Sequence, residues 1–153
     1  MSKSKVTKQG DREIRVERVF DAPRERVWSA MTESKLIAQW WGRGHKLVVE
    51  SNDVKPGGKW RFVEHAPEGV FGFEGRFREV KAPERLVLTF GWDGMPGHEI
   101  VNTMALEDLG NGRTRLVAMM VFESRKDRDG MLESGMETGM EESYVALDRL
   151  LAA

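Results

Sequence analysis

Cysteine is absent from the 153-residue sequence. Its absence excludes a disulfide-linked scaffold, a thiolate nucleophile and every zinc or iron–sulfur site that needs sulfur ligands. A chain of this length can still bury a core without cross-links, and it suits one domain better than two. Because disulfides belong to oxidising compartments, the composition fits a cytoplasmic location, which we predict.

An excess of charge of one sign is also lacking, since 24 Lys and Arg stand against 25 Asp and Glu. This balance argues against a nucleic-acid partner, which a basic surface would signal. No run approaches the roughly 20 apolar residues that cross a bilayer, so no membrane partner is expected. The one local basic excess is at the start, where residues 1–12 are predicted to form a flexible basic leader before a single domain over residues 13–153.

Signals for catalysis or metal binding are scarce. His45, His65 and His98 each lie in or beside a predicted turn, at no metal-ligand spacing to one another. No G-x-S-x-G nucleophile motif occurs. We therefore predict no catalytic residue, no metal site and no cofactor. Two polar residues remain candidates for an interior position, Asn102 and Glu64, the latter because it shares strand parity with two aromatic residues.

Large apolar side chains are abundant, with five tryptophans and nine methionines. A strand is predicted over Glu13–Phe20, where apolar and charged residues alternate. Pro23 then favours the start of a helix, and a second short helix follows until Gly42. The first strand is therefore followed by two short helices in tandem.

The middle of the chain alternates apolar and polar residues between turn signals, which is typical of strands. The turns include Pro56-Gly57-Gly58 and Gly110-Asn111-Gly112. Consecutive strands joined by such short turns predict an antiparallel meander. The predicted strands cover residues 46–53, 59–65, 70–80, 86–92, 100–106 and 116–122.

The last segment changes to a helical period. Apolar residues from Met131 to Leu151 recur every three or four positions, which predicts one helix of about 25 residues. Gly135 and Gly139 lie inside it, each at a cost of roughly 1 kcal/mol relative to alanine. Either close backbone packing or room for a ligand would explain the two glycines.

The predicted fold is α+β, with a curved antiparallel sheet of six to seven strands around the final helix. A straight helix against a curved sheet leaves a space between them unless large side chains fill it. A solid core of aromatic and methionine side chains is the alternative to a cavity. The residues predicted to line the cavity are Trp40, Trp60, Phe62, Glu64, Phe73, Phe77, Phe90, Trp92, Asn102, Met104, Met120, Met136 and Met140.

Four segments together resemble the activator of heat-shock-protein-90 ATPase homologue family, in the START/SRPBCC superfamily. They are RVFDAPRERVWSAMTESKLIAQWWG (Arg18–Gly42), DVKPGGKWRF (Asp53–Phe62), GRFREVKAPERLVLTF (Gly75–Phe90) and ESGMETGMEESYVALDRLLA (Glu133–Ala152). The resemblance implies a helix-grip fold with two short helices closing one end, and a deep apolar cavity. Arg43 stands where a proline commonly follows the Trp-Trp-Gly motif in this family. The loop there is therefore expected to be less rigid.

The predicted function is non-catalytic binding of an apolar, lipid-like or aromatic small molecule in this cavity. One alternative is a protein-interaction module related to the co-chaperones of heat-shock protein 90. A polyketide cyclase- or aromatase-like enzyme is the other, and it would need an inward polar pair. The partners considered are accordingly the apolar ligand, a second copy of the chain in a homodimer, and a chaperone.

Overall fold

Eight strands form one antiparallel sheet in the computed structural model, which describes residues 3–153. The sheet order is β1-β2-β8-β7-β6-β5-β4-β3, so β1 and β3 are its two edges. The strands are β1 (Lys5–Gln9), β2 (Glu13–Phe20), β3 (Lys46–Asn52), β4 (Lys59–Ala66), β5 (Gly69–Lys81), β6 (Arg85–Trp92), β7 (Ile100–Gly110) and β8 (Arg113–Val121).

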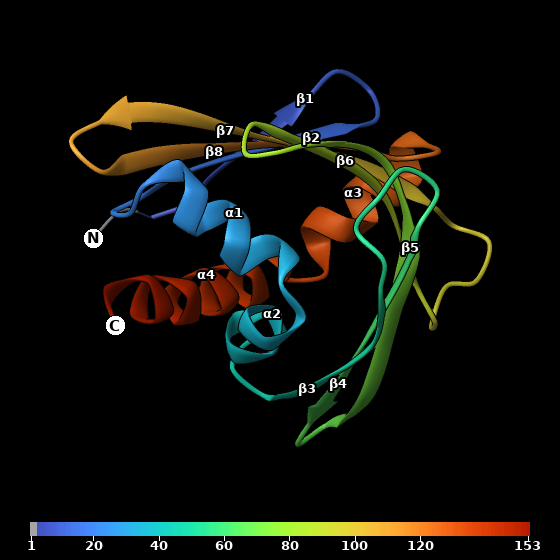
Figure 1. Cartoon of the computed structure of the whole chain (residues 1–153). Helices are drawn as coiled ribbons and strands as arrows, with labels where there is room; N and C mark the ends of the chain where they lie inside the picture. Colours follow the sequence, from blue (N-terminus) through green and yellow to red (C-terminus); the bar gives the residue numbers. More distant parts are fainter. Residues whose placement is uncertain (1–2) are drawn as a thin grey trace.

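Four helices accompany the sheet: α1 (Arg24–Thr32), α2 (Ser34–Trp40), α3 (Arg125–Glu133) and α4 (Met136–Ala152). Figure 1 shows the sheet curving around α1, α2 and α4, which lie on its concave side. The predicted α+β helix-grip architecture is confirmed, with one strand more than the six to seven expected. Among residues 3–153, no helix is long and apolar enough to cross a membrane.

The additional strand lies in the segment that we predicted to be a flexible leader. Lys5–Gln9 pairs antiparallel with Glu13–Glu17 of β2. The guanidinium of Arg128 is fully buried and donates to the backbone oxygens of Gln9, Gly10 and Glu13. Backbone pairing and this arginine hold β1, so the strand forms with little apolar alternation in its sequence.

The prediction of a single long C-terminal helix from residue 131 onward is wrong, because the helix is interrupted between α3 and α4. Gly135 adopts a φ of 85° at the N-cap of α4. A left-handed residue cannot continue a right-handed helix, so α4 starts only at Met136. The charged residues before Met131 form most of α3, and the Ser124 side chain caps its N-terminus.

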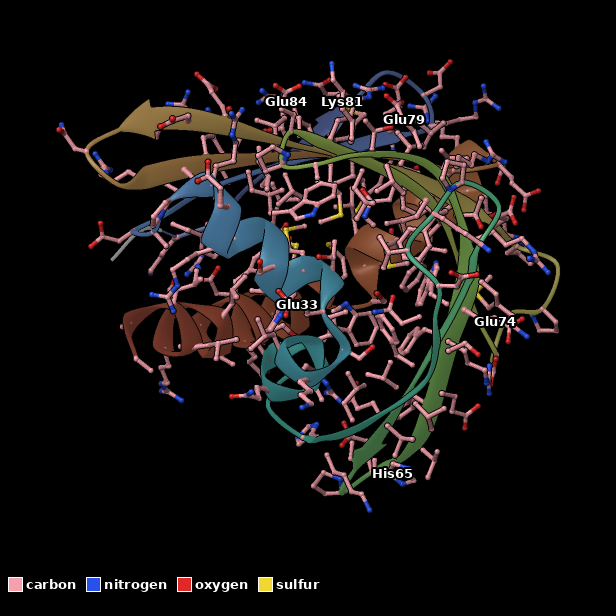
Figure 2. The ribbon with its side chains drawn as sticks, viewed as in Figure 1. Glu33, His65, Glu74, Glu79, Lys81 and Glu84 are labelled. Atoms are coloured by element: carbon pink, nitrogen blue, oxygen red, sulfur yellow. The ribbon has the colours of Figure 1, made fainter. Side chains whose placement is uncertain are left out.

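The two faces of the sheet differ in polarity (Figure 2). Figure 2 shows Glu74, Glu79, Lys81 and Glu84 pointing away from the concave side. The concave side instead carries apolar residues, which form two buried clusters. One cluster joins β2, β7 and β8 to α1 and α4, and the other joins β3–β6 to α2. Partly buried Trp28, Trp41, Phe90 and Met104 pack against both clusters.

Candidate ligand-binding cavity

A cavity of about 540 Å³ lies between the concave face of the sheet and the helices. Its volume is within the range of ligand-binding pockets, roughly 300–1,000 Å³. The structure brings all thirteen residues nominated from the sequence to its lining: Trp40, Trp60, Phe62, Glu64, Phe73, Phe77, Phe90, Trp92, Asn102, Met104, Met120, Met136 and Met140. Their part in binding a ligand stays a prediction.

Aromatic rings form a continuous wall on the β4–β6 side of the cavity. The centroids of Trp60 and Phe62 lie 4.8 Å apart, and those of Phe73 and Phe90 lie 5.5 Å apart. Trp41 meets Phe73 edge to face at 5.1 Å. These separations are those of favourable aromatic pairs, so the rings support one another and do not collapse into the space.

The indole N–H groups of two lining tryptophans are already used by the protein. Trp40 Nε1 donates to the Ala30 backbone oxygen at 2.8 Å, and Trp60 Nε1 donates to the Thr89 backbone oxygen at 3.0 Å. These bonds fix the ring orientations and satisfy the buried donors. Both tryptophans therefore present apolar ring surface to the cavity.

Glu64 is the buried acid of the cavity, with an exposed fraction of 4%. Its Oε2 accepts from Arg43 Nε at 2.9 Å and also from Arg43 Nη2, and it lies 2.8 Å from His45 Nδ1. The carboxylate enters the interior because residues 60, 62 and 64 of β4 share the concave face. The parity argument thus placed Glu64 correctly, and the structure adds its basic partners.

Arg43 lines both this cavity and an outer cleft beside α4. Its φ of 60° follows Gly42 at 88° and precedes Gly44 at 81°, an unusual left-handed run. Its backbone N–H donates to Ser143 Oγ of α4 at 2.9 Å, and Nη1 donates to Glu68 at 3.2 Å. The hydrogen bonds to Glu64 raise the pKa of the Arg43 guanidinium, which stays charged.

The two glycines of the C-terminal segment have separate roles. Gly135 forms the break before α4, whereas Gly139 lies within α4 and faces Arg43. A β-carbon on Gly139 would lie 3.2 Å from Arg43 Cδ, tighter than ordinary van der Waals contact. Close packing against the arginine side chain therefore accounts for Gly139, while Met136 and Met140 on either side of it line the cavity.

Asn102 and Tyr144 add further polar atoms to the lining. Asn102 Oδ1 is buried and has no hydrogen-bond partner among the described residues. Burial raises the pKa of the Tyr144 hydroxyl to about 12, so this phenol stays neutral. The ring of Tyr144 stacks on Trp40 at 6.1 Å and thereby joins α4 to α2.

Sequence reasoning missed Arg43, Ser143 and Tyr144 as lining residues. Tyr144 belongs to the apolar stripe of the last helix, which was a usable signal. Ser143 lies beside Tyr144 in α4 but is polar, so it is not part of that stripe. Arg43 had no such signal, because its side chain reaches the cavity from a left-handed loop. The departure from proline at position 43 marked the loop but not the direction of the side chain.

A second polar group lies where the β6–β7 loop meets the start of α3. His98 Nδ1 is 2.8 Å from Asp127 Oδ2, and the Glu99 backbone N–H donates to Glu123 at 2.8 Å. Ligand-type atoms of His98, Glu123 and Asp127 lie within 4.8 Å of one another. The hydrogen bonds hold the loop against α3, on the surface of the protein.

Comparison with known families decides the classification. A family model described as "Activator of Hsp90 ATPase homolog 1-like protein" matches residues 21–152. The chain belongs to this family. The match includes all four helices and all strands from β3 to β8, so the Activator of Hsp90 ATPase homolog 1-like region contains every lining residue of the cavity except Val16 of β2.

Solved structures agree with this classification. A crystal structure of a Rhodobacter sphaeroides protein is 29% identical over 98% of both chains, with a TM-score of 0.88. A solution structure of an Arthrobacter aurescens protein is 27% identical, covers 97% of this chain and 91% of the other, and has a TM-score of 0.87. No curated protein matches the chain. The Activator of Hsp90 ATPase homolog 1-like fold is thus shared along the whole length.

Proposed function

We propose that the protein binds an apolar small molecule, lipid-like or aromatic, in the cavity between the sheet and α4. The observation that carries this proposal is a space of about 540 Å³ lined mainly by aromatic and methionine side chains. An apolar ligand in a space of this size would remove its own surface and the apolar lining from water, which is favourable in proportion to the area buried. Methionines adapt their shape to irregular ligands, which suits Met104, Met120, Met136 and Met140.

The proposed binding is non-catalytic. A cyclase- or aromatase-like reaction would need a pair of inward groups that exchange protons with the ligand. Glu64 Oε2 already accepts from Arg43 and contacts His45, so only Oε1 remains to meet a ligand. Asn102, the other inward polar residue, does not titrate. This arrangement favours recognition over proton transfer and gives the cyclase- or aromatase-like alternative less support.

Native mass spectrometry of the purified protein, followed by solvent extraction, tests the proposal. We expect an apolar molecule to co-purify, or an added apolar dye to bind with one-to-one stoichiometry. Ala118→Phe fills the lining from β8 and should weaken dye binding by about tenfold, which equals about 1.4 kcal/mol. Val117→Phe adds the same ring on the opposite face of β8 and serves as the control. Equal dye binding by both variants and the wild type would contradict the proposal.

A second candidate function comes from the description of the family, which names activation of the Hsp90 ATPase. We propose a chaperone interaction as the alternative to ligand binding. Purified chaperone and this protein would be mixed and the ATPase rate measured. An unchanged rate and no complex in sedimentation would remove this candidate and leave the cavity as the functional site.

A further inference from the structure

The polar end of the cavity is built around one carboxylate. All three contacts of Glu64, two from Arg43 and one from His45, are with Oε2. No hydrogen bond to Oε1 is present among residues 3–153. A carboxylate oxygen accepts up to two hydrogen bonds, so Oε1 keeps its acceptor capacity in a residue that lines the cavity.

Arg43 is poorly placed to receive an anion. Its Nε and Nη2 donate to Glu64 and its Nη1 donates to Glu68. Two N–H donors of this guanidinium remain, but its single positive charge is already paired with Glu64 and Glu68. A ligand carboxylate there would add a third negative charge, and drawing Arg43 away from Glu64 would leave a buried carboxylate with fewer partners.

The local charge balance points the same way. Two carboxylates, Glu64 and Glu68, surround the single guanidinium of Arg43. His45 adds a positive charge only when it is protonated. The polar end is therefore negative or neutral, and it offers an acceptor and no uncommitted cation.

We propose that this end of the cavity recognises the hydrogen-bond-donating group of an apolar ligand, a hydroxyl or an amine, through Glu64 Oε1, and disfavours apolar carboxylates. This inference rests on the proposed ligand-binding function and narrows the ligand class. A donor on the ligand pairs with Oε1 without disturbing Arg43, His45 or Glu68. An anion meets the like charge of Glu64 and Glu68.

Three probes with the same alkyl chain test the inference: decanol, decylamine and decanoate. Each would displace an apolar fluorescent dye from the protein at a mildly alkaline pH and below micelle-forming concentration. The amine of decylamine can donate a hydrogen bond to Glu64 Oε1, whereas the carboxylate of decanoate would face it as a second anion. Decanoate should therefore bind about tenfold or more weakly than decylamine. Decanol is the uncharged reference.

The Glu64→Gln variant makes the test specific. It keeps the shape of the side chain and removes the charge. The ratio of the dissociation constant of decanoate to that of decylamine should therefore fall about tenfold, toward unity. Glu64→Asp keeps the charge and should keep the preference, which leaves the inference testable if the glutamine variant folds poorly. Glu74→Gln, on the convex side of β5, is the matched control and should leave the ratio unchanged.

The possible outcomes distinguish the donor preference at Glu64 from ligand binding in the cavity as such. Binding of all three probes with equal affinity would overturn the donor preference and leave the cavity as a general apolar site. A ratio that Glu64→Gln leaves within twofold of the wild-type value would overturn the role of Glu64. Failure of every probe to displace the dye would contradict the proposed function and this inference together.

Discussion

Asn52 and Asn102 each have a buried Oδ1 without a hydrogen-bond partner among residues 3–153, but the Asn52 side chain also donates two hydrogen bonds. Asn52, at the end of β3, donates from Nδ2 to the Thr32 backbone oxygen at 2.8 Å and to Ser34 Oγ at 3.1 Å. Asn102, near the start of β7, has only its buried Oδ1 without a partner and no such donated bonds in the described structure. A buried polar atom without a partner opposes folding, whereas a bonded one supports it.

Replacing each asparagine by leucine should therefore have opposite effects. We expect Asn102→Leu to raise the free energy of unfolding by about 1 kcal/mol, because it removes an unpaired polar atom from an apolar surface. Asn52→Leu should lower it by about 1–2 kcal/mol, because two hydrogen bonds are lost. Urea unfolding followed by tryptophan fluorescence measures both. A loss of stability in Asn102→Leu equal to that in Asn52→Leu would contradict the argument.

Residues inside regular strands were predictable, and residues in left-handed loops were not. The period of two along β4 places Trp60, Phe62 and Glu64 on one face, so an inward acid followed from parity alone. Arg43 reaches the same carboxylate from a loop with φ of 60°. No periodicity exists in such a loop, and the direction of its side chain depends on contacts made in the folded protein.

The break between α3 and α4 is set by the backbone conformation of one glycine. A β-carbon on Gly135 would meet no heavy atom within 4 Å, so space does not require glycine there. Its φ of 85° does, because a β-carbon clashes with the backbone in the left-handed region. Gly130, in α3, is equally open but has no left-handed φ.

These two glycines give a matched pair of variants. Gly135→Ala should lower the free energy of unfolding by about 1–2 kcal/mol, the cost of a left-handed residue with a β-carbon. Gly130→Ala should raise it by about 0.5–1 kcal/mol, because alanine is the better helix former and meets no neighbour. Thermal unfolding by circular dichroism distinguishes the signs. Stabilisation by both substitutions would show that α3 and α4 can join into one helix.

The type of each element was easier to predict than its ends. Apolar spacing from Met131 onward fits a helix on both sides of the break, so periodicity alone could not show that Gly135 interrupts it. β1 was missed because its sequence lacks the apolar alternation that marks a strand. Its backbone pairs with β2 and its end is held by Arg128, and neither interaction depends on an apolar pattern in Lys5–Gln9.

At the scale of the whole molecule, the cavity follows from how two apolar clusters meet. One cluster lies under α1 and α4 and the other under α2, and the cavity lining takes residues from both. Sequence patterns predicted a concave apolar face and a covering helix. They could not decide between a filled and an open space, because that depends on side-chain contacts across strands far apart in the sequence.

The contact between the β6–β7 loop and α3 should make the stability of the whole fold depend on pH. Hydrogen bonding to Asp127 raises the pKa of His98, and Glu123 adds to the effect. Because the pKa of His98 is raised in the folded state, protonated His98 stabilises the fold. This stabilisation is complete below the unfolded-state pKa of about 6.5 and is lost as pH rises through the folded-state pKa.

The difference in unfolding free energy between the wild type and His98→Gln should therefore be larger in mildly acidic than in alkaline buffer. Urea unfolding across this range measures it. His65→Gln, at a position exposed on β4, is the control and should show a smaller change with pH. A wild-type advantage that grows as pH rises would have the wrong sign for a protonated His98 on Asp127, and would show that another group joins the loop to α3.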